Sequence, residues 1–330
     1  MTAVYEGWPA PVFDLMRSIS TAQYTTVSAA GVPIDTPVLI FPSDGLASFD
    51  LATGLAYPAK AERARRNPRV SLLFEGRPDE PLVLLLGFAS VRDGDLQANV
   101  LRYLSEAGHT LPHHPTWELA RRAVWYWTRI LVEVRPASVL WWSSPAAMAY
   151  PPSRWDAPAG TVYPPSDPVP AGAGSKPAKW EQARSWRDLA DRALARNAPG
   201  HLSLVNADGF PLTVRAASVG LTPDGFRLGL PAGLPGPVTG KSSLTFTGIE
   251  TFIGEMLTPD LMRVDRALPI FPMTADMAQL WQPTPHTRGE LMKRLIEETR
   301  RRGQPIPQIP LELPDPTESY RLRMARGRNA

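Results

Sequence analysis

The sequence predicts a mainly β protein with peripheral helices, built from two similar β units in tandem. Short runs of β-forming residues separated by turns predict strands, and a basic stretch in the first half predicts a helix. Part of the first half recurs in the second half, which predicts the duplication. A chain of 330 residues also has the length of about two domains of ~150 residues each.

The composition excludes several classes of protein. Hydrophobic residues make up 43% and charged residues 20%, as in globular proteins, and 37 prolines predict many loops and edges. The absence of cysteine excludes disulfides, cysteine-based metal sites and a cysteine nucleophile. The longest apolar run, 81–89, is shorter than the ~20 residues of a membrane span, and we recognise no signal peptide. We therefore expect a cytoplasmic protein with no membrane partner.

The net charge of +3 is small, and the basic residues near the C-terminus are typical of a solvated helix end and tail. We therefore expect no nucleic-acid partner.

The first half alternates strands with a few helices. Val12, Leu15, Met16 and Ile19 are spaced as one face of a helix. The Ala30-Gly31 turn joins two strands, and Asn67-Pro68 ends the basic helix because the residue before proline avoids the α region. The expected helices are 9–19, 58–66, 95–107 and 117–122, and the expected strands are 24–29, 34–41, 46–51, 69–75, 82–91 and 124–135.

The second half repeats part of the first. Residues 27–33 match 205–211, and residues 70–76 match 242–248, in the same order. The helix of 58–66 has only a proline- and glycine-rich loop, 231–240, as its counterpart. The sequence therefore predicts a duplicated β unit whose second copy has lost one element.

Two further helices and a proline-rich segment complete the organisation. The expected helices are 179–197 and one that begins at the capping-box pattern of Thr287 and Glu290. The expected units are a first β unit at 1–144, a linker or extended wrapping segment at 145–178, a degenerate second β unit at 179–272, and a C-terminal helix with its tail at 273–330.

The stretch from 47 to 76 carries the chemistry. A strand leads through a loop of small residues into a helix that begins with Pro58 and has Lys60 in its first turn. Free N–H groups at a helix start, the helix dipole and a lysine together bind phosphate, and Thr53 and Ser48 offer hydroxyl donors. The alternative is a basic surface helix with solvated side chains.

Residues 58–74 resemble a segment of the pyridoxamine 5′-phosphate oxidase-like split β-barrel superfamily, which includes FMN-binding oxidases and flavin/deazaflavin oxidoreductases. Residues 25–38 look like the opening hairpin of that superfamily, and 126–136 like its closing strand. The resemblance covers about 10–142, and 200–270 more weakly. It implies two split β-barrel units in tandem, with a cofactor between two barrels.

The resemblance also implies the site. Lys60 would hold the cofactor phosphate, and Thr53, Ser48 and Asp50 lie on or beside the preceding strand. By the same resemblance, the residues that would face the cofactor ring are Thr36, Pro37 and Val38. The oxidases have an Arg and a Lys on this last strand, and an Arg where Ala59 stands, so this chain lacks two or three phosphate ligands. These departures argue against oxidation of pyridoxamine phosphate itself.

The resulting hypothesis is an enzyme, a flavin- or deazaflavin-dependent oxidoreductase that acts on a small molecule. The expected cofactor is FMN, with the deazaflavin coenzyme F-420 and then haem as alternatives. No residue is assigned to catalysis and none to a metal. The alternative function is a cofactor-free or haem-binding split-barrel protein with a binding or structural role. The tandem chain is expected to form a monomeric pseudo-dimer or a homodimer.

Overall fold

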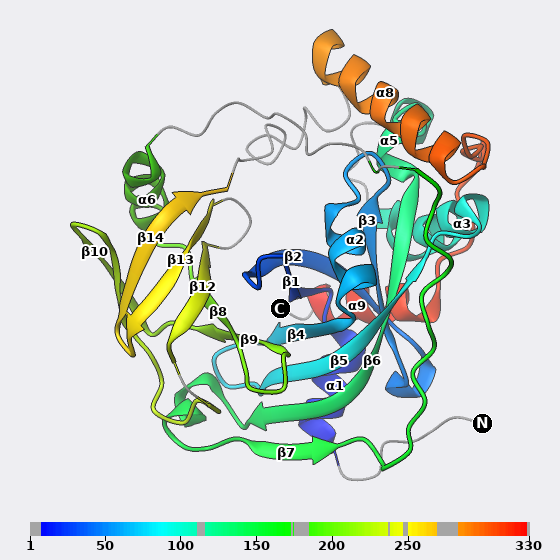
Figure 1. Ribbon diagram of the computed structural model, residues 1–330. Coiled ribbons are helices and arrows are strands. Elements are labelled where there is room, and N and C mark those ends of the chain that lie inside the picture. The colour runs from blue at the N-terminus through cyan, green and yellow to red at the C-terminus, as the bar shows by residue number, and fades with distance from the viewer. Residues whose placement is uncertain are drawn as a thin grey trace.

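The computed structural model describes residues 8–110, 116–172, 174, 185–236, 238–246, 250–268 and 283–328. Two seven-stranded antiparallel sheets form its centre, and helices lie around them (Figure 1). This arrangement confirms the predicted fold class, which is mainly β with two barrel-like units and peripheral helices. No described helix is long and apolar enough to cross a membrane.

The first sheet closes on itself. Its strand order is β3-β2-β1-β4-β5-β6-β7, and β3 also pairs with β6, so six strands form a barrel. Alternating side chains such as Val38, Ile40 and Leu51 fill the barrel interior. The strands are β1 (Thr21–Val27), β2 (Pro33–Pro42), β3 (Phe49–Gly54), β4 (Arg69–Glu75), β5 (Leu82–Arg92), β6 (Arg129–Trp142) and β7 (Ser153–Asp156).

The second sheet has the same succession of strands. Its order is β10-β11-β14-β13-β12-β8-β9. The strands β8, β9, β11, β12, β13 and β14 correspond to β1, β2, β3, β4, β5 and β6 in chain order and in pairing. The strands are β8 (Gly200–Val205), β9 (Pro211–Arg215), β10 (Ser218–Thr222), β11 (Gly225–Gly229), β12 (Gly240–Phe246), β13 (Glu250–Thr258) and β14 (Leu261–Ala267).

The second sheet differs from the first at the counterpart of β2, which is divided into two strands, β9 and β10. In the first barrel, β2 pairs with β1 along its first part and with β3 along its last part. In the second sheet these two roles fall to β9 and β10. The backbone N–H of Ala216 still donates to β8 at Gly200, whereas that of Ala217 donates to β11 at Gly229. Together β9 and β10 therefore make the pairings that β2 alone makes in the first barrel.

The hairpins predicted to be repeats have the same turn. Gly31 and Gly209 both adopt positive φ, 76° and 81°, which glycine accepts without strain. In each turn a side-chain oxygen, from Ser28 or Asn206, accepts the N–H four residues later. The matched sequences 27–33 and 205–211 thus have the same local structure.

Helices cover the rims of the sheets. They are α1 (Ala10–Ser18), α2 (Ala59–Arg66), α3 (Leu96–Ala107), α4 (Trp117–Ala120), α5 (Val124–Trp127), α6 (Trp186–Ala195), α8 (Pro285–Arg301) and α9 (Glu318–Arg328), with 3₁₀ turns at Asp44–Leu46, Gly108–Thr110 and Pro145–Ala149.

Three expectations for these elements change. The strand expected at 46–51 is β3, which begins only at Phe49 and continues to Gly54, because Asp44–Leu46 forms a 3₁₀ turn. The strand expected at 124–135 begins only at Arg129, because the preceding residues form the helical turn α5. The helix expected at 179–197 is α6, and residues 179–184 lie outside the described residues.

The proline-rich segment after β6 follows the first barrel. Its strand β7 pairs with β6. Further along, the N–H of Asp167 donates to the carbonyl of Val91 on β5, and the Ser166 hydroxyl accepts the N–H of Val91. In this part of the segment the chain therefore lies extended on the barrel.

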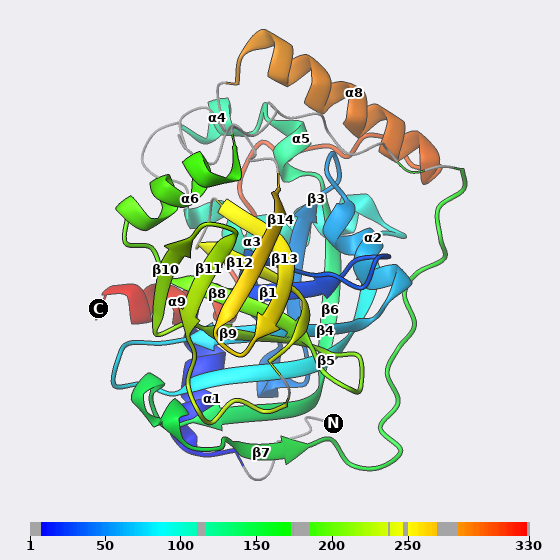
Figure 2. The same cartoon turned by 60° about the vertical axis from the view of Figure 1, so that its left-hand side comes forward.

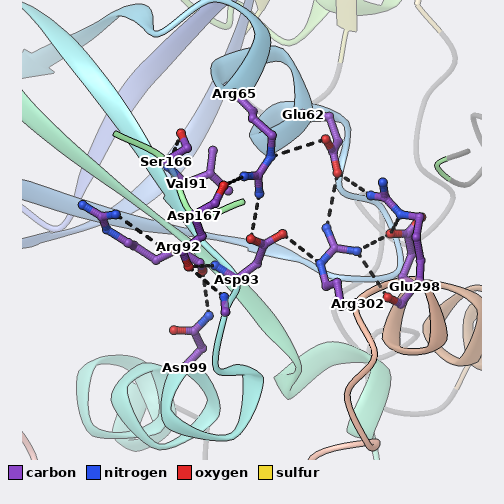
Figure 3. Close-up of polar contacts among 12 residues, drawn as sticks. Glu62, Arg65, Val91, Arg92, Asp93, Asn99, Ser166, Asp167, Glu298 and Arg302 are labelled. Carbon is purple, nitrogen blue, oxygen red and sulfur yellow. Dashed lines mark hydrogen bonds and ion pairs between the residues drawn. The ribbon is translucent and has the colours of Figure 1, made fainter. Parts of the chain in front are cut away.

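A buried network of charges fastens α8 to α2 (Figure 3). Arg302, just after α8, contacts Asp93 at 2.8 Å and also Glu298 and Glu62, and its side chain is 2% exposed. Arg65 of α2 reaches the other oxygen of Asp93 at 2.7 Å. Each buried charge in this network therefore has an opposite charge beside it, as burial requires.

The two sheets meet through apolar and polar side chains. The facing strands are β1, β2, β4 and β5 of the barrel and β8, β9 and β12 of the second sheet (Figures 1 and 2). Leucines of β4 and β5 lie in one hydrophobic cluster with leucines of β8 and β9. The Thr25 and Thr213 hydroxyls lie 2.6 Å apart across this contact, and His201 Nε2 lies 2.6 Å from Glu75 Oε2. We call this set the polar seam: Gln23, Thr25, Asp35, Ser71, Glu75, His201, Ser203, Thr213 and Ser243.

Asp35 is a buried carboxyl of the polar seam with an oxygen left unsatisfied by the described residues. It is 2% exposed, and its Oδ2 has no hydrogen-bond partner among the described residues. Burial raises the pKa of Asp35 to about 7, although the charge of His201 opposes this shift. Burial by itself would lower the pKa of His201, but its hydrogen bond to Glu75 and the charges of Glu75 and Asp35 raise it.

Arg302→Ala should destabilise the fold by about 3 kcal/mol, because Asp93 and Glu298 would stay buried with one partner fewer. Urea denaturation measures the difference. Arg300→Ala removes an exposed arginine from the same helix and should change the stability by less than about 0.5 kcal/mol. Equal stability of the two variants would contradict the role given to Arg302.

Asp35→Asn should flatten the dependence of stability on pH. The pKa of Asp35 is higher in the fold, about 7, than in an unfolded chain, so the folded state binds more protons between about pH 4 and 7. The free energy of unfolding of the natural protein therefore falls as pH rises through this range. The variant should lack this fall, worth about 1.4 kcal/mol per pKa unit.

The measurement for Asp35 is a series of denaturation curves from pH 4 to 8. Asp44→Asn, at an exposed aspartate, makes the same charge change and should keep the slope of the natural protein. Parallel curves for the natural protein and Asp35→Asn would rule out a role for this carboxyl.

Candidate functional site: a cation cluster at the start of α2

The helix α2 begins where β3 leaves the barrel. The N–H of Leu55 donates to the carbonyl of Thr128, which ties the connecting loop to the start of β6. Pro58 precedes the helix, and no side chain caps its first N–H groups. Ala61 and Ala64 are buried, so the helix packs closely against β1, β5 and β6. The sequence thus places an uncapped helix start at the barrel surface.

Three basic side chains meet at this helix start. Lys60 lies in the first turn, Arg63 lies one turn later on the same face, and Arg129 is the residue paired with Gly54 at the end of β3. We call these three residues the cation cluster. Burial lowers the pKa of Lys60 to about 8, and the charges of Arg63 and Arg129 lower it further, while that of Asp35 opposes them. The Lys60 ammonium therefore lies in desolvated, positively charged surroundings.

The two arginines are held by neutral groups. Arg63 Nε donates to the Thr26 hydroxyl at 2.7 Å, and burial lowers the pKa of Arg63 to about 10. Arg129 is 5% exposed and lies over the rings of Tyr103 and Tyr126, at 4.5 and 4.1 Å from their centres. These contacts fix both side chains without cancelling their charge.

No residue of the cation cluster forms an ion pair with a carboxylate in the part of the chain that the structure describes. The Nε of Arg129 has no hydrogen-bond partner among the described residues either. Buried charge is costly unless it is paired, so this arrangement fits an anionic ligand. Together with the uncapped helix start, it has the chemistry of a phosphate site.

Gly54 allows a tyrosine to support Arg129. A Cβ atom at position 54 would collide with the Tyr57 ring, so only glycine leaves room for that ring against the strand. The Tyr57 hydroxyl then lies 3.3 Å from Arg129 Nη1. A single small residue at the end of β3 thus helps to place the most deeply buried cation of the site.

The residues expected at the site fall into two groups, and one group lies near the cation cluster. Lys60 belongs to the cluster, and Thr53 lies on β3 one residue before Gly54, with its buried hydroxyl 3.5 Å from the Tyr57 carbonyl. Thr36 and Pro37 follow Asp35 on β2 and are half-buried. Val38 is buried in the barrel interior, so its side chain does not line the face toward the second sheet.

Ser48 and Asp50 have other partners. Ser48 pairs with Ser43 through its backbone, and Asp50 Oδ2 lies 3.1 Å from Arg102 of α3. Asp50 lies four residues before Gly54 on β3, or about 13 Å at ~3.3 Å per residue. Burial raises the pKa of Asp50 to about 6, with Arg102 opposing the shift. The structure therefore does not bring these two residues to Lys60.

Sequence analysis missed several residues of the site. Arg63 could have been found from its spacing of three from Lys60 on one helix face. Arg129 and Tyr57 meet only because β3 pairs with β6, and Asp35 becomes important only because the second sheet buries it. Local sequence carries no signal for those two long-range contacts.

Two of the three described histidines have partners of their own, and the third, His286 at the start of α8, is exposed. His201 contacts Glu75, and His109 Nε2 lies 2.7 Å from the carbonyl of Pro314. Residues 113 and 114 lie outside the described residues. No group of three metal-ligating side chains is found among the residues described.

No protein-family model and no curated protein matches this chain. Among solved structures, it is similar to a conserved hypothetical protein from Mycobacterium tuberculosis, with 24% identity over 42% of this chain and 87% of that one, at a TM-score of 0.34. A pyridoxamine 5′-phosphate oxidase-related, FMN-binding protein from Nostoc punctiforme is 13% identical over 43% of this chain and 85% of that one, at a TM-score of 0.32. An F420 reductase is 14% identical over 41% of this chain and 98% of that one, also at 0.32.

These similarities cover less than half of this chain, and they concern the fold alone. The barrel itself is established by its own strand pairing. In fold, this chain resembles the pyridoxamine 5′-phosphate oxidase-like split β-barrel proteins.

Proposed function

We propose that this protein binds a phosphate-bearing cofactor of the flavin type and serves as an oxidoreductase for a small molecule. The observation that supports the proposal is the cation cluster of Lys60, Arg63 and Arg129, which has no carboxylate partner among the described residues. FMN is the first candidate because its phosphate carries a full dianionic group, and the deazaflavin coenzyme F-420 is the second.

The residues present fit the phosphate. The free N–H groups and dipole of α2 would receive one side of it, and the Lys60 ammonium would receive another. The unpartnered Nε of Arg129 offers a further donor. Thr53 stays a candidate hydroxyl donor beside this group. These groups would bind and orient the cofactor, and a bound flavin would supply hydride chemistry.

The cofactor ring would lie beside Pro37, which is half-buried, because the second sheet already covers Asp35 on the same face of β2. Asp35 and Pro37 alternate on this face, whereas Thr36 and Val38 occupy the opposite one. β8 and β12 pack against β2 and would exclude water from the ring. Asp35, whose pKa is about 7, could hold a proton beside this position near neutral pH.

In a tandem chain both sheets come from one polypeptide. The strands of the second sheet take the place that a second subunit would take, so we propose a monomeric pseudo-dimer. A cofactor-free binding protein is the second candidate, and it would leave the buried Arg129 and the half-buried Lys60 and Arg63 without a counter-charge. Among the described histidines, His109 and His201 have partners and His286 is exposed on α8, so haem is not favoured.

Lys60→Ala should weaken FMN binding by about 1.5–3 kcal/mol, the value of a hydrogen bond to a charged group. This loss corresponds to a dissociation constant roughly 10–150 times higher. Fluorescence titration of the purified, full-length protein with FMN, and then with coenzyme F-420, measures it. Lys293→Ala, at an exposed lysine of α8, should leave the affinity unchanged.

Two results would count against this proposal. Unchanged affinity in Lys60→Ala would remove Lys60 from the phosphate site. Failure of the natural protein to bind either cofactor, together with a visible spectrum without a chromophore, would favour the cofactor-free alternative.

A further inference from the structure

A cavity of about 540 Å³ lies between the two sheets, away from the cation cluster. On one side it is lined by the end of β4 and the start of β5, including Glu75 and Leu82. On the other side lie the junction of β9 and β10, which includes Arg215, and the end of β12 at Phe246. Its volume is that of a site for a small organic molecule, for which 300–1,000 Å³ is usual.

The repeat of the fold relates this cavity to the proposed cofactor site. In the first hairpin Gln23 pairs with Pro37, and at the matching place in the second hairpin His201 pairs with Arg215. Arg215 therefore stands where Pro37 stands in the first barrel. Among the described residues no helix lies between β11 and β12, where α2 lies between β3 and β4 in the first barrel, so this part of the cavity wall offers no helix start to hold a cofactor phosphate. It must accordingly take a different ligand.

The charges of the cavity favour an anion. The Arg215 guanidinium makes no ion pair or hydrogen bond with any described residue. The carboxylate of Glu75 is hydrogen-bonded to His201 through Oε2, so these two groups largely offset each other when His201 is protonated. Arg215, whose side chain is exposed at the cavity wall, is then left as the charge without a protein partner among the described residues.

The other lining groups describe the rest of the ligand. Oε1 of Glu75 is buried and has no hydrogen-bond partner among the described residues, so it can accept a hydrogen bond from the ligand. Leu82, Met148 and Phe246 line the cavity with apolar surface. A carboxylate with a hydrocarbon or aromatic body and an N–H or O–H group would satisfy all three features, as would a phosphate of the same kind.

We propose that this cavity is a second binding site, in which Arg215 binds the anionic group of a small, partly apolar organic acid and Glu75 accepts a hydrogen bond from it. The site is separate from the cation cluster. It does not depend on the proposed cofactor.

The probe is 8-anilinonaphthalene-1-sulfonate, which combines an anion, an N–H group and two aromatic rings. The full-length protein should bind one molecule with enhanced fluorescence. Arg215→Ala should weaken this binding about tenfold, the scale of one charge-assisted hydrogen bond, and Arg215→Lys should restore part of it. Arg187→Ala, at an arginine of α6 that does not line the cavity, should bind as the natural protein does.

Competing ligands and a further variant identify the ligand class and test whether the probe binds in this cavity. Displacement of the probe by 4-hydroxybenzoate would indicate a carboxylate ligand, and displacement by phenyl phosphate a phosphate ligand. Ser218→Trp, which places a large ring in the cavity wall, should abolish binding. Lys60→Ala should leave the probe bound and Arg215→Ala should leave FMN bound, so either proposal can fail alone. Equal probe affinity in the natural protein and Arg215→Ala, or an equal loss in Arg187→Ala, would overturn the assignment.

Discussion

The contact between the two sheets is the constraint on which the rest of the structure depends. Part of it is apolar, because leucines of β4 and β5 lie in one hydrophobic cluster with leucines of β8 and β9. Beside this cluster the facing strands present hydroxyls, a histidine and two carboxylates, and few of these groups are exposed. Pairs such as Thr25 with Thr213 and Glu75 with His201 fit only in one register of the two sheets. Apolar burial therefore stabilises the contact, and the polar pairs fix how the sheets sit together.

This contact also places both candidate sites. Asp35 of the polar seam lies close enough to influence the pKa of Lys60. Glu75 of the same seam lines the cavity beside Arg215. The two sheets have matching strand orders but differ in chemistry at these places. The first has a helix start with three cations, and the second has Arg215 at the cavity wall.

The helix α2 separates two kinds of charge. Glu62 and Arg65 point to the network with α8, in which every buried charge has an opposite partner (Figure 3). Lys60 and Arg63 lie on another face of the same helix and have no carboxylate partner in the described part of the chain. One face of α2 therefore binds α8 through paired charges. The other face keeps the positive charges of Lys60 and Arg63, with which no described carboxylate pairs. The ion pairs between α8 and α2 hold the helix start in place, and Arg294 of α8 also donates a hydrogen bond to the carbonyl of Ala56 in the loop that leads into α2.

The sequence by itself determined the elements with strong local signals. The basic helix after Pro58, the paired hairpins at 27–33 and 205–211, and the mainly β fold follow from proline, turn glycines and β-forming runs, which act within a few residues. Lys60, the first residue of the proposed phosphate site, was predicted from the same local pattern.

Only the tertiary structure decided the rest. Arg129 enters the site through the pairing of β3 with β6, Asp50 is carried away by the length of β3, and Asp35 gains its unusual pKa from burial by the second sheet. These outcomes depend on contacts between residues far apart in the chain, and the free energy of such contacts is not written in any local stretch of sequence.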